Sequence, residues 1–253
     1  MKITFLGTGT SQGVPVIACK CDVCLSNNLK DKRLRSSVLI EFQNKTIVID
    51  TGPDFRQQML RERVEKLDAV LFTHAHKDHV AGLDDIRSFN FRSKKPMDIF
   101  CTNVVLNALR MEYSYIFSEK TYPGVPKVNV NIIENTNFFV DDIEIQPIQA
   151  LHYKLPVLGF RIKNFIYLTD LSEINSTEKR KMINADVIVL DSLRNEPHLS
   201  HLSLDESIAL IKELKPKQAY LIHVSHLMGL HDQVNSDLPT NIHLSYDGLQ
   251  LNI

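Results

Sequence analysis

Three histidines and one aspartate lie within six residues of one another, in the order H-x-H-x-D-H. They are His74, His76, Asp78 and His79. Few proteins carry this spacing except to hold metal. The first two imidazoles can turn to one ion, whereas the aspartate and the last histidine, displaced along the turn, reach a second. Because imidazole and carboxylate together suit zinc, manganese or iron, the motif predicts a two-metal site rather than a polar turn with exposed histidines.

The place of the motif in the chain supports a catalytic role. An apolar run at 69–72 directly precedes the motif and has the length and composition of a buried strand. The motif is therefore predicted in the loop at the end of that strand. Loops held by a rigid scaffold are where catalytic residues concentrate.

Three further candidate ligands are each predicted just after a strand: His152, Asp170 and His223. Any one of them alone is more often an ordinary polar residue than a ligand. Together with the motif they complete two ligand sets. The first set is His74, His76 and His152, and the second is Asp78, His79 and His223. Asp170 is predicted to bridge the two metal ions.

Three of the four cysteines crowd into one short stretch, at Cys19, Cys21 and Cys24. Neighbours this close cannot all form sensible disulfides with one another. A closed structural zinc site has four ligands, so the three thiolates would need a fourth ligand from elsewhere. The alternative is three free surface thiols. Cys101 stands alone on an apolar run and is predicted to be a buried core residue.

Length and composition set wide bounds. With 253 residues and 43% hydrophobic content, the chain can bury a large core as one domain or two small ones. A net charge of −1 and a pI near 6.8 show no overall excess of basic residues of the kind that binds nucleic acid. A local basic patch is compatible with these values. We expect no signal peptide and no membrane span. The crowded cysteines favour a reducing compartment, so we predict a cytoplasmic protein.

Strand-like and helix-like segments run from end to end without a Pro/Gly/Ser-rich linker. Strands are predicted at 3–6, 37–42, 46–49, 69–72, 98–101, 143–147, 159–162, 165–168, 187–190 and 219–222. Helices are predicted at 54–63, 80–87, 104–115, 176–184 and 203–214. Ser203 and Glu206 form a capping box at the start of the last helix. We expect one α/β domain over residues 1–253, with two sheets inside and helices outside.

On these residues the chain resembles the metallo-β-lactamase fold, a four-layer αβ/βα sandwich, and its hydrolase branch with a full two-metal site. The resemblance runs essentially from end to end and includes two short segments. These are Gly7-Thr8-Gly9-Thr10 and Asp50-Thr51-Gly52. It implies that Asp50 supports the metal-binding loop through a hydrogen bond and does not bind metal itself. The alternative for Asp50 is a plain turn residue before Gly52.

The cysteine loop resembles that of the PhnP-type cyclic phosphodiesterases. This resemblance implies that a histidine shortly after His223 completes a structural zinc site. His226 is at that place. A zinc ion held by Cys19, Cys21, Cys24 and His226 would tie the amino-terminal loop to the loop that carries His223, and its role would be rigidity.

The resemblance implies phosphodiester hydrolysis by a hydroxide shared between two zinc or manganese ions, roughly 3.5 to 4 Å apart. Asp78 and Asp170 would contribute to the hydrolysis by binding these ions. His201 matches a histidine of the family that contacts the phosphate or assists the leaving group. We expect His198 to be a loop residue that faces water, and His231 receives no role.

The implied substrates are small cyclic ribose phosphates or 2′,3′-cyclic nucleotides, and nothing in the spacing selects among them. Aromatic residues between 113 and 122 could form a lid over a base or sugar. We prefer a packing role for Tyr113 and Tyr115, against a helix or in a homodimer interface. Membrane binding is not expected, and nucleic acid is a less favoured partner.

Four alternatives remain at this stage. A β-lactamase, thioesterase or lactonase would also use a metal-activated water, but the cysteine loop and Asp78 favour a phosphodiesterase. Ribonuclease Z shares the histidine motif, yet it usually carries a Gly/Pro-rich arm that this sequence lacks. The PqqB relatives have a cysteine loop but depart from the full motif. A zinc-stabilised binding protein would usually have lost one or more ligands, and none is lost.

Overall fold

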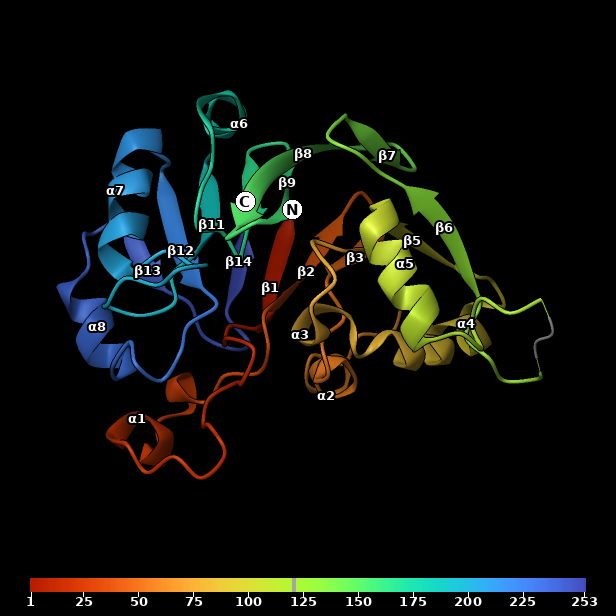
Figure 1. Cartoon of the computed structure of the whole chain (residues 1–253), viewed down its shortest axis with the longest axis horizontal. Helices are drawn as coiled ribbons and strands as arrows, with labels where there is room; N and C mark the ends of the chain where they lie inside the picture. The colour runs from red at the N-terminus through yellow and green to blue at the C-terminus, as the bar shows by residue number, and fades with distance from the viewer. Residues whose placement is uncertain (120–121) are drawn as a thin grey trace.

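Two seven-stranded sheets pack face to face, and helices cover the outer face of each sheet (Figure 1). A computed structural model of the protein describes residues 1–119 and 122–253. The predicted four-layer αβ/βα sandwich is therefore confirmed.

The first sheet has the order β14-β1-β2-β3-β4-β5-β6. In that order its strands are Gln250–Asn252, Lys2–Gly7, Ser37–Phe42, Lys45–Ile49, Ala69–Leu71, Met97–Cys101 and Val128–Ile132. Neighbours are antiparallel from β14 to β3 and parallel from β3 to β6. The helices on its outer side are α2 (Phe55–Arg61), α3 (Lys77–Val80), α4 (Arg87–Ser93) and α5 (Asn103–Glu112).

The second sheet has the order β13-β12-β11-β10-β9-β8-β7. In that order its strands are Ile242–Leu244, Gln218–Ile222, Val187–Asp191, Phe165–Leu168, Leu155–Ile162, Ile143–His152 and Phe138–Val140. Neighbours are parallel from β13 to β10 and antiparallel from β10 to β7. Helices α6 (Ser176–Met182), α7 (Leu204–Leu214) and α8 (His231–Asp237) belong to this half. The short α1 (Asp22–Leu25) lies in the cysteine loop.

The main core fills the space between the two sheets. Phe5 and Ile40 from the first sheet meet Phe160 and Tyr167 from the second, and all four are fully buried. A separate apolar cluster joins each sheet to its own helices. Each sheet is thus buried on both faces, which fits the nearly continuous apolar runs in its central strands.

Helix α7 begins where its capping box predicts. The Ser203 hydroxyl accepts from the backbone N–H of Glu206, and the Glu206 carboxylate accepts from the backbone N–H of Ser203. Leu210, Ile211 and Leu214 are buried against the second sheet. Local capping and helical periodicity therefore agree with the packing of this element.

The helix predicted at 80–87 is wrong in its bounds. The structure has α3 at Lys77–Val80, a 3₁₀ turn at Leu83–Ile86 and then α4. Gly82 interrupts the helical run because it packs against the turn that follows β3: a Cβ on Gly82 would lie 2.2 Å from the Gly52 carbonyl oxygen. Because α3 begins at Lys77, Asp78 and His79 lie in a helical turn and not in an open loop.

Four strands were not predicted, namely β6, β7, β13 and β14, and all four are the outermost strands of their sheets. Strands β7, β13 and β14 have only three residues each, and no residue of β6 is buried. None of the four therefore carries an apolar run long enough to predict a strand. Strand β8 also runs five residues past its predicted end and includes His152. His152 therefore lies in a strand and not in the loop after it.

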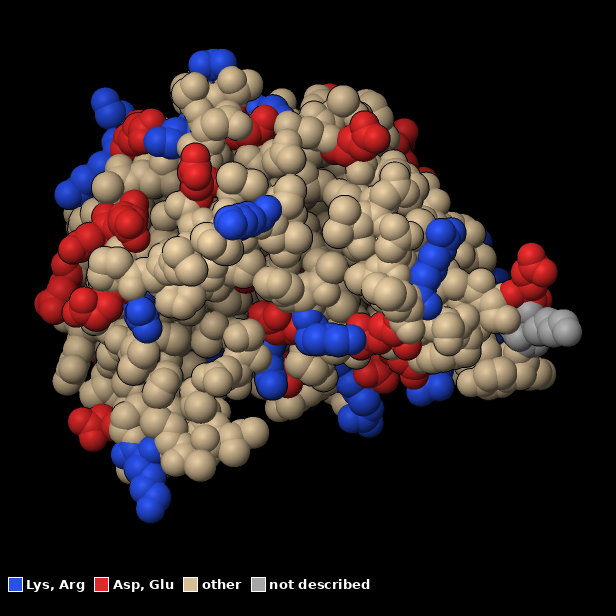
Figure 2. Space-filling model, in the orientation of Figure 1, with Lys and Arg blue, Asp and Glu red and all other residues tan. Residues whose placement is uncertain are grey.

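On the face shown in Figure 2, lysine and arginine are interspersed with aspartate and glutamate. Within the described residues, no helix has both the length and the apolar character needed to cross a membrane.

Candidate active site

The candidate site lies where the carboxyl ends of parallel strands from both sheets meet. Strands β3 and β4 lead to Asp50 and His74, and β10 and β12 lead to Asp170 and His223. In open α/β folds this end of the strands is where ligands bind. Three of these residues adopt left-handed backbone conformations, with φ of 63° at Asp50, 57° at Asp170 and 63° at His223. Such strain in non-glycine residues clusters at functional sites.

His74, His76 and His152 form the first group, and their potential ligand atoms lie within 4.8 Å of one another. The Nδ1 atoms of two of them are engaged elsewhere. The Nδ1 of His152 donates to the Ser200 carbonyl oxygen at 2.7 Å, and the Nδ1 of His74 lies 3.0 Å from the Thr73 hydroxyl. These contacts leave Nε2 of His74 and His152 free to meet a ligand.

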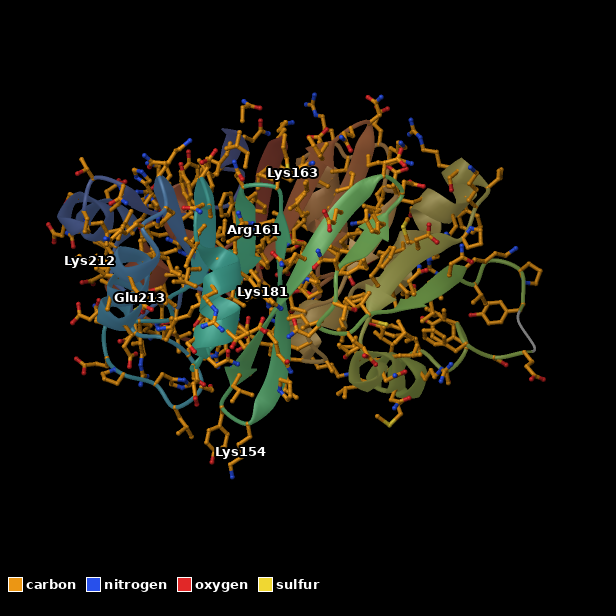
Figure 3. All side chains as sticks on the ribbon, turned by 90° about the horizontal axis from the view of Figure 1, so that it is seen from above. Lys154, Arg161, Lys163, Lys181, Lys212 and Glu213 are labelled. Atoms are coloured by element: carbon orange, nitrogen blue, oxygen red, sulfur yellow. The ribbon has the colours of Figure 1, made fainter. Side chains whose placement is uncertain are left out.

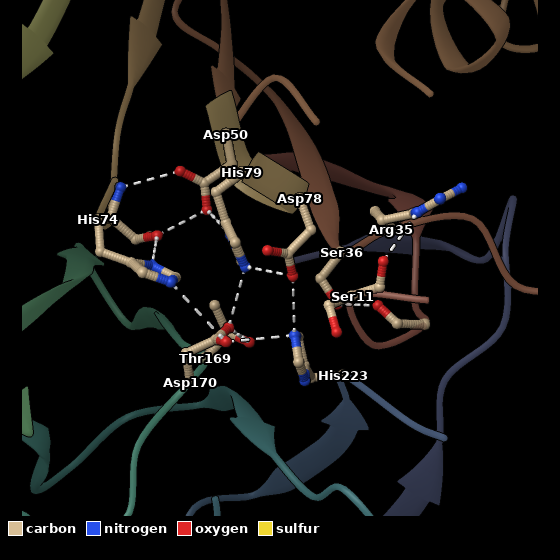
Figure 4. A network of polar contacts seen from close by, with 12 residues as sticks. Ser11, Arg35, Ser36, Asp50, His74, Asp78, His79, Thr169, Asp170 and His223 are labelled. Carbon is tan, nitrogen blue, oxygen red and sulfur yellow. Dashed lines mark hydrogen bonds and ion pairs between the residues drawn. The ribbon is translucent and has the colours of Figure 1, made fainter. Parts of the chain in front are cut away.

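Asp78, His79, Asp170 and His223 form the second group, and all four are buried. The Asp170 carboxylate lies 3.3 Å from Nε2 of His79 and 3.2 Å from Nε2 of His223. It also lies 3.9 Å from Nε2 of His74 in the first group. Asp170 is thus placed between the two groups (Figure 4).

Asp50 binds the last histidine of the motif and the residue just before its first histidine. Its carboxylate accepts from the backbone N–H and the hydroxyl of Thr73, at 2.9 and 2.8 Å, and from Nδ1 of His79 at 2.7 Å. The turn after it fits closely because residue 52 is glycine: a Cβ there would lie 2.2 Å from the Asp78 carbonyl oxygen. The contacts orient Nε2 of His79 towards Asp78 and Asp170.

The buried histidines and carboxylates of the site shift one another's pKa values. Burial would lower the pKa of His79, yet the surrounding carboxylates, Asp170 foremost, hold this pKa well above its usual range. Burial would likewise raise the pKa of Asp170, but His223 and His79 keep it well below the usual range. The pKa of His74 is lowered well below its usual value, by burial and by His79.

Unpaired polar atoms test whether a metal ion fits. The Nε2 atoms of His74, His79 and His223 are buried, and none has a hydrogen-bond partner among the described residues. Buried polar atoms without partners are uncommon and need an explanation. The three Nε2 atoms face the Asp170 carboxylate at 3.2 to 3.9 Å without a hydrogen bond to it. A divalent cation bound by imidazole and carboxylate together would satisfy both, so these residues fit a pair of metal ions.

His201 lies beside both groups. Its ring is 4.5 Å from that of His152 and stacks on that of His223 at 4.7 Å, measured between ring centres. Nδ1 of His201 lies 3.3 Å from the Asp191 carboxylate. Burial lowers the pKa of His201, but Asp191 outweighs this effect and raises the pKa to about 9.

Asp191 was not identified from the sequence. Besides contacting His201, its carboxylate accepts from the backbone N–H groups of Leu202 and Asp170, at 3.1 and 3.3 Å. A signal was present, because Asp191 directly follows the apolar run 187–190, much as Asp170 closely follows β10.

The other residues considered from the sequence lie as follows. His198 is exposed, as expected, although its ring lies 5.3 Å from that of His201. His231 is buried and contacts the Arg33 guanidinium at 3.2 Å, away from both metal groups.

Tyr113 and Tyr115 brace the motif from outside the site. The Tyr113 hydroxyl donates to the Val80 carbonyl oxygen at 3.1 Å, and the Tyr115 hydroxyl donates to Asp84 at 2.5 Å. Tyr113 is buried in the core on the outer side of the first sheet. Tyr115 packs against the same core, so both side chains have packing contacts within the chain, and a dimer interface stays a prediction. Residues 120–121 of the same segment lie outside the described residues.

The cysteine loop forms a third candidate metal group with His226. Nδ1 of His226 lies 3.3 Å from the sulfur atoms of Cys19 and Cys21, and the Cys24 sulfur accepts from the Val16 backbone N–H at 3.3 Å. All four cysteines of the chain are free. Hydrogen bonds from the Cys24 backbone and His226 lower the pKa of Cys21 to about 6, whereas burial raises the pKa of Cys24 to about 11. Cys101 is fully buried, as predicted.

Fold and site define the class of protein. The chain belongs to the beta-lactamase superfamily, whose domain matches residues 45–224. Within that superfamily, a diphosphatase from the PhnP family has a solved structure that is 35% identical, with a TM-score of 0.93, and the match covers 100% of this chain and 97% of that one. The predicted resemblance is confirmed, and the family includes hydrolases.

Other relatives differ in name. An octanoyltransferase of Porphyromonas gingivalis is 37% identical over 99% of this chain and 51% of its own length. A ribonuclease Z of Staphylococcus epidermidis is 27% identical over 64% of this chain and 49% of its own length. The chain thus spans about half the length of these curated relatives. Zinc-bound PqqB from Methylobacterium extorquens shares the fold, with 17% identity, a TM-score of 0.81 and full coverage of both chains.

Proposed function

We propose that the protein is a hydrolase of small phosphodiesters that uses two divalent metal ions, zinc or manganese. The observation that carries this proposal is that Asp170 lies between a group of three histidines, of which His74 and His152 are buried, and a buried group of histidine and aspartate. The Nε2 atoms of His74, His79 and His223 are buried and make no hydrogen bond to any described residue. Similarity to a PhnP-family diphosphatase over nearly its whole length supports phosphorus chemistry.

One ion would be held by His74, His76 and His152, and the other by Asp78, His79 and His223, with Asp170 between them. When bound, the pair of ions would activate a water molecule and neutralise charge on the phosphoryl oxygens. The protein's own groups orient the ligands: Asp50 fixes His79, and the Ser200 carbonyl fixes His152. A third ion, a structural zinc, would be held by Cys19, Cys21, Cys24 and His226.

His201 is proposed as the group that protonates the leaving alkoxide. Asp191 keeps its imidazole protonated near neutral pH and holds Nδ1, which leaves Nε2 to face the substrate. A donor whose pKa lies above the working pH is present in the required form. The favoured substrates are small cyclic ribose phosphates or 2′,3′-cyclic nucleotides.

A second candidate function is hydrolysis of an acyl ester or thioester. The relative that covers nearly the whole chain is named octanoyltransferase, but the chain spans only half of that protein. Acyl chemistry applies to this chain only if the half of the octanoyltransferase that matches it carries the named activity. The same activated water could attack an acyl carbonyl, so this candidate is tested beside the first.

The test compares four substrates on protein loaded with manganese or zinc: bis(p-nitrophenyl) phosphate, a 2′,3′-cyclic nucleotide, a precursor transfer RNA and octanoyl thioester. Asp170→Ala and His201→Ala serve as variants, and Asp205→Ala, an exposed carboxylate on α7, is the control.

We expect turnover of the small diesters, which Asp170→Ala abolishes and Asp205→Ala leaves unchanged. His201→Ala should lower turnover of the 2′,3′-cyclic nucleotide, whose leaving group is an alkoxide, by about 100-fold or more. The same variant should affect bis(p-nitrophenyl) phosphate much less, because p-nitrophenolate leaves without a proton. Cleavage of the RNA alone would favour the ribonuclease Z alternative, and turnover of the thioester alone would favour acyl hydrolysis. No turnover of any of the four by protein with two bound ions would reject the proposed function and favour a binding protein.

A further inference from the structure

A cavity of about 320 Å³ opens beside the first metal group. The motif contributes His74 and Ala75 to its lining, α5 contributes its first turn, and β9 contributes Leu155 and Leu158. We refer to it as the side cavity. None of its lining residues except His74 has a place in the proposed reaction.

The side cavity adjoins the first group of proposed metal ligands. Leu155 pairs with His152 in the β8–β9 ladder, and the backbone N–H of Leu158 donates to the Thr73 carbonyl oxygen at 3.1 Å, directly before His74. Ala75 lies between His74 and His76 in the chain. A substituent on a reacting atom held at the first metal group therefore lies next to the mouth of the cavity.

The lining is mainly aliphatic. Its larger apolar residues are Val104, Val105, Ile133, Leu155, Pro156 and Leu158, and its polar residues besides His74 are Thr102, Asn103, Glu134, Asn135 and Gln149. Val104 is 62% exposed although it is apolar, so its side chain offers free surface at this wall. Binding of an apolar group there would remove this surface from water, which is favourable.

The lining contains no lysine or arginine that could bind a further phosphate group of a substrate. Lys181 contacts one lining residue from behind, and its ammonium group is already used: it donates to Asn135 Oδ1 at 2.7 Å and to the Pro147 carbonyl oxygen at 3.0 Å, and it pairs with Glu178 at 2.9 Å. Figure 3 shows Lys181 close to Arg161, whose guanidinium donates to the Lys181 carbonyl oxygen. The only carboxylate of the lining, Glu134, would repel an anion.

We propose that the side cavity binds an uncharged, apolar group of the substrate, an alkyl or aryl ester arm. This inference rests on the proposed hydrolysis of phosphodiesters but departs from the cyclic ribose phosphates favoured above. Among phosphodiesters, the protein would prefer those in which one ester carries an apolar group over those with only small or hydroxylated groups. The apolar arm lies against Val104 and Leu155 while the phosphate is held at the metal groups.

The test uses two diesters with the same leaving group, methyl p-nitrophenyl phosphate and octyl p-nitrophenyl phosphate, below the micelle concentration of the latter. Val104→Asp places a charge in the cavity wall, and an aspartate near a helix N-terminus does not disfavour the helix. Asn107→Asp adds the same charge to α5 at an exposed residue outside the lining, and it is the matched control.

We expect kcat/KM for the octyl diester to exceed that for the methyl diester at least tenfold, mainly through KM. Val104→Asp should lower the ratio of the two kcat/KM values at least fivefold and leave kcat/KM for the methyl diester within twofold of its original value. Asn107→Asp should change neither the ratio nor kcat/KM for the methyl diester. Equal efficiency for both diesters in the unmodified protein, or equal losses for both in Val104→Asp, would overturn the proposal.

Calorimetry separates this proposal from the proposed function. If neither diester is hydrolysed, the proposed function fails, and binding of octylphosphonate and methylphosphonate to the metal-loaded protein still decides the role of the cavity. Octylphosphonate that binds at least tenfold more tightly, and loses this advantage in Val104→Asp alone, supports an apolar subsite. Equal affinities for the two phosphonates reject it.

Discussion

His79 shows how a proposed metal ligand is oriented by a residue outside the proposed ligand set. Its Nδ1 donates to Asp50, and the same carboxylate binds both the backbone and the hydroxyl of Thr73. One buried carboxylate therefore fixes the ring of His79 and the residue before His74. Metal ligands whose second ring nitrogen is held in this way bind metal more strongly.

Replacement of Asp50 by asparagine should weaken metal binding. The amide keeps the size of the side chain but loses its charge and one acceptor, so we expect metal affinity to fall roughly 10- to 100-fold, as measured by competition with a chromogenic chelator. Asp68→Asn, at the opposite end of β4, is the control and should retain the original affinity. Equal affinity in Asp50→Asn would show that His79 needs no such support.

Replacement of Asp191 by asparagine should change the pH profile. His201 is proposed to donate a proton, so activity is lost as pH rises through its pKa, which Asp191 raises to about 9. Without the carboxylate this pKa falls, and the loss of activity should begin at a lower pH. The measurement is kcat/KM for a 2′,3′-cyclic nucleotide, whose leaving group is an alkoxide, between pH 6 and about 10.

Asp205→Asn, on the exposed face of α7, removes the same charge without a contact to His201. Its alkaline limb should coincide with that of the unmodified protein. If Asp191→Asn also keeps its alkaline limb, His201 is not the proton donor.

At the scale of elements, short segments position the chemistry. The helical turn α3 carries Asp78 and His79, and it can approach the turn after β3 only because Gly52 and Gly82 have no side chains. The cysteine loop reaches across to His226, which lies three residues after His223. Two distant segments are thereby joined beside the second metal group.

Replacement of Cys21 by serine should cost the protein its structural zinc. A hydroxyl is a poor substitute for a thiolate in a four-ligand zinc site, so metal analysis after mild chelation should find one zinc ion in the unmodified protein and none in Cys21→Ser. Cys101→Ala removes a thiol outside the group and should retain the zinc. Retention of zinc in Cys21→Ser would contradict the structural site.

At the scale of the whole molecule, the contact between the two sheets brings the halves of the site together. His74 and His79 come from the first half, and Asp170 and His223 come from the second. Apolar side chains between the sheets hold this arrangement, among them Phe160, which pairs with Tyr167 across β9 and β10 and contacts Phe138.

Replacement of Phe160 by alanine should lower the free energy of unfolding by about 3–5 kcal/mol, because it leaves a cavity between the sheets. The measurement is urea-induced unfolding followed by circular dichroism. Phe139→Ala, at a residue that is 59% exposed, should change the free energy by no more than about 0.5 kcal/mol. A similar small change for Phe160→Ala would show that the inter-sheet core adjusts to the loss.

The sequence by itself determined the local elements and the residue types of the site. The central strands, the cap of α7 and the seven candidate active-site ligands were all predicted, because apolar periodicity, capping and ligand chemistry are recorded in short stretches of chain. The metallo-β-lactamase fold followed from the resemblance that these motifs carry.

Only the tertiary structure decided which distant residues meet. The outermost strands are too short or too exposed to leave a clear apolar pattern. The role of Asp191 depends on a contact with His201 that exists only after β11 and the loop before α7 have packed. The side cavity has no signature in sequence either, since α5, β8 and β9 build it together. Contacts of this kind depend on how two sheets bury their shared faces, and no local stretch of sequence records that packing.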